Sequence, residues 1–392
     1  MNRLSFSSLS SLRRIAIVVA LNNAWFWVPI WVLYYRRFTN YSGVALLEAL
    51  SMAVSMSMIV PGGILSDWIG RKRLLIISSV FAFIGAVGAG AASSFGMLIF
   101  FILFLSLSAS LYQASIHALI YDTLKSNHAE DRYERVLGKF ITVQMLSAAF
   151  ASAVGGVLYR IDPSLPWYAV GVASLINIGV GFLLVDPPVE TLHDSFSQFM
   201  KEAGKGIRLL IKHSWVDTVP LICVGIFLTT DSSGLWDIQA VEFGLTSQQL
   251  GILLTSTYLV LAGVSSFLPR ILRKVPERGV IIGSTAAFSL LWFFSSFVGK
   301  GVGAPLLIFR SAFSVLFDLK AFVMFNRFIP TPIRATTLSV ISIIRGVPYI
   351  VVSWAMGLLL DTIGIGFLVR LYAVVLFVLC LWTWRLWNVN RR

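Results

Sequence analysis

The sequence predicts an all-α polytopic membrane protein whose twelve transmembrane helices form two pseudo-symmetric bundles of six. Three observations lead to this fold class. First, 57% of the 392 residues are hydrophobic and only 12% are charged. Second, long apolar runs follow one another along the chain. Third, one polar stretch separates the first six of these runs from the last six. Soluble domains carry about 25% charged residues. In water this chain would expose a large apolar surface, whereas a lipid bilayer solvates such a surface.

The apolar runs are each about 20 residues long, which is the length of helix that crosses a bilayer. Strands of a membrane barrel would be shorter and would alternate apolar with polar residues. The first run is too long for the apolar core of a signal peptide. The predicted spans are residues 15–35, 44–65, 74–94, 97–119, 137–159, 167–185, 217–239, 249–269, 280–299, 304–325, 335–359 and 365–386.

The longest polar stretch lies between the sixth and seventh spans. It starts with Asp186 and two prolines, which stop a helix, and its remainder interleaves apolar and basic residues as a membrane-surface helix does. We therefore expect an N-terminal six-helix bundle at 1–185, a cytoplasmic linker with an amphipathic basic helix at 186–214, and a C-terminal six-helix bundle at 215–392.

The net charge of +13 is explained by membrane topology. Most of the 31 lysine and arginine residues fall in loops on one side of the predicted spans, and the positive-inside rule places that side, with both termini, in the cytoplasm. Nucleic-acid binding is not needed to explain this basicity. We expect a monomer in the plasma or inner membrane, surrounded by lipid. Cys223 and Cys380 lie in apolar runs and are expected to be packing residues.

The loop between the second and third spans carries a specific motif. Residues 63–75 read GILSDWIGRKRLL. This segment matches G-x-L-x-D-x-x-G-R-K-x-x-L, the loop signature of the major facilitator superfamily, at every fixed position, and the chain therefore resembles that family. The one departure is Trp68, where family members usually carry a basic residue. The resemblance implies a transporter in which helices one, four, seven and ten line a central cavity.

Two weaker features agree with this resemblance. Gly155-Gly156 in the fifth span looks like part of the family's glycine-rich fifth helix, but the proline typical of antiporters is absent. An offset of about 202 positions places Arg273-Lys274 on Arg71-Lys72. Degenerate repeats of this kind are expected from two six-helix halves.

The motif residues have physical roles that do not depend on the family. Gly63 would let its helix approach a neighbour closely, and Gly70 would permit a tight turn. Asp67 can accept hydrogen bonds from the free amides at the start of another helix, where the partial charge is positive. We expect that helix to be the eleventh span, which begins near Ala335.

Arg71 is expected to pair with Asp122 at the end of the fourth span. Together with Asp67, this pair would hold the two halves closed on the cytoplasmic side. The alternative is that the basic cluster only sets topology, and for Lys72 and Arg73 this is the favoured interpretation.

Ionisable residues at membrane depth mark function by default, because each is costly to bury in lipid. A rise of about 1.5 Å per residue puts Asp231 and Arg310 at similar depths, and likewise Asp318 and Arg345. We therefore expect two pairs, Asp231 with Arg310 and Asp318 with Arg345, that serve substrate binding or proton coupling. The alternative is that they are structural ion pairs between helices. Glu48 is a further candidate proton carrier.

Polar side chains in the first and fourth spans are candidates for substrate contact. Asn22 and Asn23 offer both donors and acceptors, and Trp25 offers a stacking face or a place in an interfacial belt. Gln113 and His117 stand four residues apart in the fourth span.

The sequence contains no complete motif for nucleotide binding, zinc binding or nucleophilic catalysis. We therefore expect neither an enzyme nor a cofactor or metal site. The expected function is secondary active transport of a small organic solute by alternating access, coupled to protons. Three alternatives stay open at this point: a multidrug/proton antiporter, a symporter of organic anions or sugars, and a non-transporting receptor or scaffold of the same fold.

Overall fold

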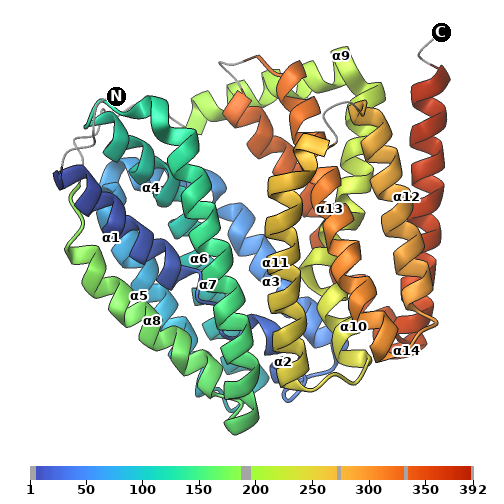
Figure 1. Ribbon diagram of the computed structural model, residues 1–392, viewed down its shortest axis with the longest axis horizontal. Coiled ribbons are helices and arrows are strands. Elements are labelled where there is room, and N and C mark those ends of the chain that lie inside the picture. Colours follow the sequence, from blue (N-terminus) through green and yellow to red (C-terminus); the bar gives the residue numbers. More distant parts are fainter. Residues whose placement is uncertain (1–5, 187–195, 272–274, 331–333, 390–392) are drawn as a thin grey trace. The chain divides into compact units, whose positions relative to one another are not determined.

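The computed structural model describes residues 6–186, 196–271, 275–330 and 334–389. Within these ranges every regular element is helical (Figure 1). Seven helices are long and apolar enough to cross a membrane, or eight if the bent pair Tyr41–Ser57 and Ile59–Ile69 counts as one span. The predicted all-α membrane fold is confirmed. The number of twelve spans stays a prediction, and one 54-residue candidate, Thr336–Val389, is itself kinked at Gly364.

Contacts divide the chain into two compact units, which are described separately. Unit 1 consists of Met1–Tyr34, Leu50–Ser195 and Ser247–Tyr258. Its helices are α1 (Phe6–Asn22), η1 (Val28–Ile30), α2 (Trp31–Tyr35), α4 (Ile59–Ile69), α5 (Arg71–Gly90), α6 (Phe95–Lys125), η2 (Glu130–Arg132), α7 (Tyr133–Ile161) and α8 (Leu165–Phe182). Helix α5 packs along α6 and α8, and α1 lies against α6, α7 and α8. Ile15, Val18 and Val19 of α1 join Leu119 and Ile120 of α6 in the core.

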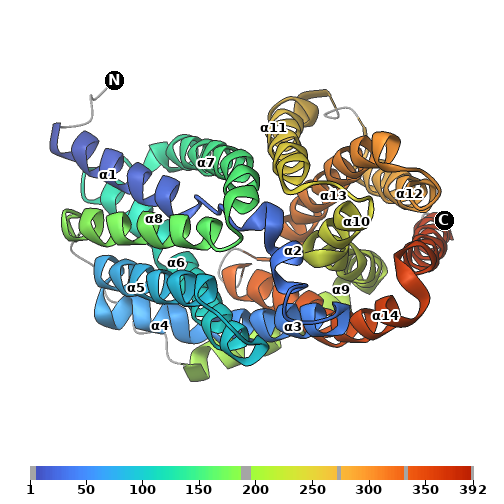
Figure 2. The ribbon, with the colours of Figure 1, turned by 90° about the horizontal axis from the view of Figure 1, so that it is seen from below.

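Unit 2 consists of Tyr35–Ala49, Phe196–Thr246 and Leu259–Arg392. Its helices are the first part of α3 (Tyr41–Ser57), α9 (Phe196–Thr230), the π-helical turn η3 (Asp231–Leu235), α10 (Trp236–Glu242), the later part of α11 (Ser247–Ile271), α12 (Glu277–Ser295), α13 (Lys300–Phe328) and α14 (Arg334–Val389). Helix α14 packs along α9 and α12, and α13 lies against α12 (Figure 2).

Glycines permit close helix packing inside unit 1. A Cβ atom on Gly155 or Gly156 of α7 would collide with the backbone carbonyls of Phe26 and Ser247, respectively. The glycine pair noticed in the sequence therefore marks a place where α7 touches neighbouring backbone, which is a common use of small residues between membrane helices.

Two predicted features involve residues outside the described ranges. The predicted linker includes 187–195, and the degenerate repeat rests on Arg273 and Lys274. The later part of the linker is helical, because α9 begins at Phe196 and continues without interruption through Thr230. The domain boundaries at 185 and 215 stay predictions.

Candidate functional site

The first predicted span of each half is interrupted within its length. Helix α1 ends at Asn22, and regular structure resumes only at Val28. In the seventh span, α9 ends at Thr230 and a π-helical turn begins at Asp231 before α10. Irregular backbone is tolerated at membrane depth only where it is buried in protein or lines a cavity. Asn23 and Asp231, which lie at these two interruptions, are therefore candidate functional residues.

Asp231 lies at the start of the π-helical turn and contacts Arg310 of α13. Arg310 Nη2 is 2.7 Å from Asp231 Oδ1, and the two side chains are 0% and 4% exposed. Arg310 Nη1 donates to Gln239 Oε1 at 2.7 Å, and the guanidinium lies 5.2 Å from the Trp292 ring centroid. The structure thus brings together the first pair expected from helix depth. Both charges are buried, so removing either one leaves the other unpaired.

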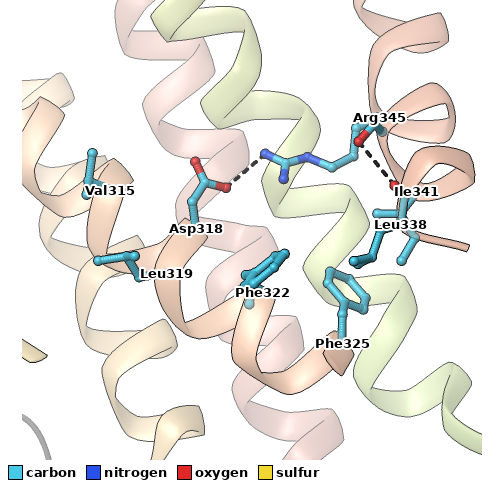
Figure 3. Close-up of a pocket in the computed structure, with 10 residues that line it drawn as sticks. Val315, Asp318, Leu319, Phe322, Phe325, Leu338, Ile341 and Arg345 are labelled. Atoms are coloured by element: carbon cyan, nitrogen blue, oxygen red, sulfur yellow. Dashed lines mark hydrogen bonds and ion pairs between the residues drawn. The ribbon is translucent and has the colours of Figure 1, made fainter. Parts of the chain in front are cut away.

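The second expected pair, Asp318 and Arg345, lies at a pocket. Arg345 Nη2 is 3.1 Å from Asp318 Oδ1, and the Arg345 and Asp318 side chains are 21% and 48% exposed. The pocket has a volume of about 430 Å³. Figure 3 shows the two charged side chains pointing toward each other from facing helices, with Phe322 and Phe325 beside them. The remaining lining residues are Val315, Leu319, Ala321, Leu338, Ile341 and Ser342.

Helix α9 fixes the position of the Arg345 guanidinium through hydrogen bonds. Arg345 Nη2 donates to the Gly225 carbonyl and to Thr229 Oγ1, each at 3.2 Å. A Cβ atom on Gly225 would lie 2.6 Å from Arg345 Nε and 2.8 Å from Cζ. Gly225 therefore provides the space that the guanidinium occupies. The sequence does not reveal this role, because a glycine inside an apolar span gives no sign of its partner.

We expect Gly225→Ala to lower solute affinity about tenfold, because the added methyl group displaces the Arg345 guanidinium from its position beside Asp318. Solute binding to the purified protein, measured by thermal shift or calorimetry, checks this. Gly283→Ala is the matched control, since a Cβ atom there meets no described atom within 4 Å. Equal affinity in the two variants would show that the position of Arg345 is unimportant for binding.

Glu48 of α3 lies in unit 2. Its carboxylate is close enough to Asp237 for the two charges to interact. Glu48 is half-buried. The structure therefore places Glu48 of α3 near a second acidic side chain, Asp237 of α10.

In unit 1, Asn23 lies in the break after α1 and is fully buried. Its Nδ2 donates to the Val19 carbonyl at 2.8 Å and contacts Tyr112 Oη at 3.4 Å. Asn22 and Trp25 are half-buried on either side of it. Asn23 therefore fixes the break in the helix. Its contact with Tyr112 of α6 could not be expected from the sequence, because nothing in the residue pattern places these two side chains together.

Gln113 and His117 form an exposed polar stripe on one face of α6. They are one helical turn apart, so they project on the same side. Polar residues exposed in the middle of an apolar span face a water-filled cavity more readily than lipid. Their proposed contact with substrate stays a prediction.

The motif loop forms a charge network within unit 1. Arg71 Nε is 2.6 Å from Asp122 Oδ2, and Arg71 Nη1 is 2.9 Å from Asp67 Oδ1. Gly70 adopts a positive φ of 92°, so the tight turn expected there is present. Lys72 Nζ donates to the Phe182 carbonyl at 2.9 Å. The contact expected between Asp67 and the helix near Ala335 stays a prediction.

The expected close approach of Gly63 is not found among the described residues. A Cβ atom on Gly63 would meet no atom within 4 Å, whereas one on the preceding Gly62 would lie 3.1 Å from Ala114 Cβ of α6. Gly62 therefore provides the close approach, because it is this glycine that faces α6.

Among the described residues no group of three or more His, Cys, Asp or Glu side chains is placed to hold a metal ion.

Comparisons with known proteins agree with this architecture. The chain is 23% identical over 326 residues to a Na⁺, Li⁺, K⁺/H⁺ antiporter of Planococcus maritimus, covering 71% of this chain and 74% of that protein. It is 31% identical to an uncharacterised MFS-type transporter of Methanocaldococcus jannaschii over 126 residues, which are 32% of this chain and 30% of that protein.

Similar solved structures include the nucleoside transporter NupG, with a TM-score of 0.80, 14% identity and coverage of 98% and 99% of the two chains. A D-xylose–proton symporter has a TM-score of 0.75 at 12% identity and covers 97% of each chain. These likenesses concern the fold. The family model described as Major Facilitator Superfamily matches residues 15–236, which is more than half of the chain. The protein is therefore a multi-pass membrane transporter rather than an enzyme, and it belongs to the Major Facilitator Superfamily.

Proposed function

We propose that this transporter is a secondary active transporter that moves a small organic solute by alternating access, with proton coupling in unit 2. The observation that carries the proposal is the Asp318–Arg345 pair at the edge of the apolar, aromatic pocket (Figure 3). A site with a few charged groups among apolar walls is typical of small-molecule binding.

The pair offers a direct route to coupling. While Asp318 is ionised, its carboxylate forms an ion pair with the Arg345 guanidinium. When Asp318 takes up a proton, Arg345 becomes available to an acceptor group of the solute, such as a carboxylate or hydroxyl. The solute's apolar part would then lie against Phe322 and Phe325. Proton uptake and solute binding thereby favour each other, which is the condition for coupled transport.

The buried Asp231–Arg310 pair would act on conformation rather than on the solute. It joins the π-helical turn to α13, and neither side chain is exposed to solvent. A change in the charge of Asp231 would therefore alter how this broken helix packs. We place the protein in the cell membrane with both termini in the cytoplasm, as the charge distribution predicts.

Proteoliposomes with an imposed pH gradient test this proposal. We expect uptake of at least one member of a panel of organic anions, polyols and amphipathic amines, driven by the gradient and abolished by a protonophore. Failure of every solute to move, or movement that ignores the gradient, would overturn it.

A second candidate is exchange of a monovalent cation for protons. The similarity to a Na⁺, Li⁺, K⁺/H⁺ antiporter and the neighbouring acids Glu48 and Asp237 favour it. The same vesicles, loaded with a pH-sensitive dye, distinguish the two. Addition of Na⁺, Li⁺ or K⁺ would move protons under cation exchange, and would have no effect if only organic solutes are carried.

A further inference from the structure

A second copy of the loop motif's first half occurs within α14. Residues 357–364 read GLLLDTIG and residues 63–70 read GILSDWIG, so both contain G-x-L-x-D-x-I-G. Each copy ends at a glycine with positive φ, 92° at Gly70 and 74° at Gly364, and each glycine marks where one helix stops and the next begins. The two segments therefore share conformation as well as spacing.

The carboxylate of the second copy, Asp361, caps helix α3. The Tyr41 amide donates to Asp361 Oδ1 at 3.0 Å, and the Ser42 amide donates to Oδ2 at 2.9 Å. The next amide, of Gly43, donates to Asn40 Oδ1 at 3.1 Å. The first amides of a helix have no partner within the helix and carry positive partial charge. Asp361 satisfies two of them with one negative charge.

Close packing accompanies this cap. A Cβ atom on Gly357 would lie 2.5 Å from Ala45 Cβ and 2.9 Å from Ser42 Cα. The Tyr41 hydroxyl hydrogen-bonds to Glu242. The glycine and the aspartate of the second copy therefore both hold the start of α3, one by allowing contact and the other by charge.

The contact involves a helix, α3, whose residues are divided between the two units. Residues Tyr35–Ala49 group by their contacts with unit 2, whereas the rest of α3, from Leu50, groups with unit 1. Tyr41 and Ile69 are the first and last residues of the bent pair α3 and α4. Asp361 thus acts at the end of this span opposite to Asp67.

We propose that Asp361 is a positioning residue for transport: it fastens the start of α3 to unit 2 in one state of the cycle and releases it in the other. Asp67 would play the corresponding role at the other end of the same span. This inference rests on the proposed alternating access, but it concerns a contact that shares no residue with the solute pocket.

Spin-label distances test directly whether Asp361 fastens the start of α3. Labels at Arg37 and Ile363, which are both exposed, would report the separation of the α3 start from α14 after Cys223 and Cys380 are replaced by serine. We expect Asp361→Ala to raise the population with a long distance about tenfold, the scale of a lost helix cap. Gly357→Ala should shift the distribution in the same direction by steric contact alone, which keeps the test valid if Asp361→Ala folds poorly.

The control is Asp162→Ala, because Asp162 is exposed and its carboxylate accepts from the nearby Ser164 amide. Asp67→Ala should shift the same distance the opposite way, a result that a merely structural role for Asp361 would not produce. The proposal fails if Asp361→Ala matches Asp162→Ala, or if Asp361→Ala and Asp67→Ala shift the distance in one direction. No solute is needed, so a negative transport assay would leave this result interpretable.

Discussion

Replacing Asp231 by asparagine is expected to abolish proton-driven uptake, with a loss of at least about 100-fold, and to lower the free energy of unfolding by about 3–5 kcal/mol. The physical reason is that Arg310 is fully buried and would keep its charge without its carboxylate partner. Gln239 and the Trp292 ring would still contact the guanidinium, but neither carries a compensating charge. Uptake in proteoliposomes and thermal unfolding in detergent measure the two effects.

The matched control for this variant is Asp217→Asn. Asp217 lies on α9, the helix that leads to Asp231, and it also pairs with an arginine, Arg278, at 2.8 Å. Because the Arg278 side chain is 32% exposed, water can take over the lost interaction. We expect this control to retain uptake and to lose little stability. If Asp217→Asn and Asp231→Asn behaved alike, burial of the Asp231 pair would not explain the effect.

Replacing Arg345 by alanine is expected to raise the solute KM about 10- to 100-fold, because a hydrogen bond to a charged group contributes about 1.5–3 kcal/mol. Arg345→Lys should recover only part of this loss, since an ammonium group cannot form the paired hydrogen bonds of a guanidinium. Both variants should fold, because the Arg345 side chain is partly exposed at the pocket. Initial rates of uptake over a range of solute concentrations measure the effect.

Arg327→Ala provides the comparison for this second prediction. Arg327 is on α13, the helix that carries Asp318, and it forms an ion pair with Glu277, but its side chain is 62% exposed. Its removal should leave the KM unchanged. An Arg345→Ala variant with an unchanged KM would place the solute site elsewhere, with the polar stripe of Gln113 and His117 as the next candidate.

The sequence predicts much of the fold and the charge pairing. Apolar length identifies spans because the bilayer requires about 20 residues to cross it. The depths estimated from the sequence correctly predict that Asp231 pairs with Arg310 and that Asp318 pairs with Arg345. The reason is that a charge inside the membrane is stable only with a partner at a similar depth. Arg71 and Asp122 follow from the motif and its family resemblance.

Features that depend on packing between distant residues could not be predicted in this way. The contact of Gly225 with Arg345 requires knowledge of which helices are neighbours, and the choice between Gly62 and Gly63 requires the rotation of a helix. The π-helical turn at Asp231 follows from hydrogen bonding that residue patterns do not show. The repeat at 357–364 did carry a signal in its spacing, but a search at the offset of the two halves does not align it with 63–70.

The most direct test of the account is the double variant Asp231→Leu/Arg310→Met. Replacing a buried ion pair by apolar residues of similar size is often neutral or stabilising, so this variant should regain the stability that Asp231→Asn loses. If the charges of this pair control the conformation that transport requires, gradient-driven uptake should stay absent in the stable double variant. Full recovery of uptake together with stability would show that the pair only holds helices together, and would contradict its proposed role in the conformational cycle.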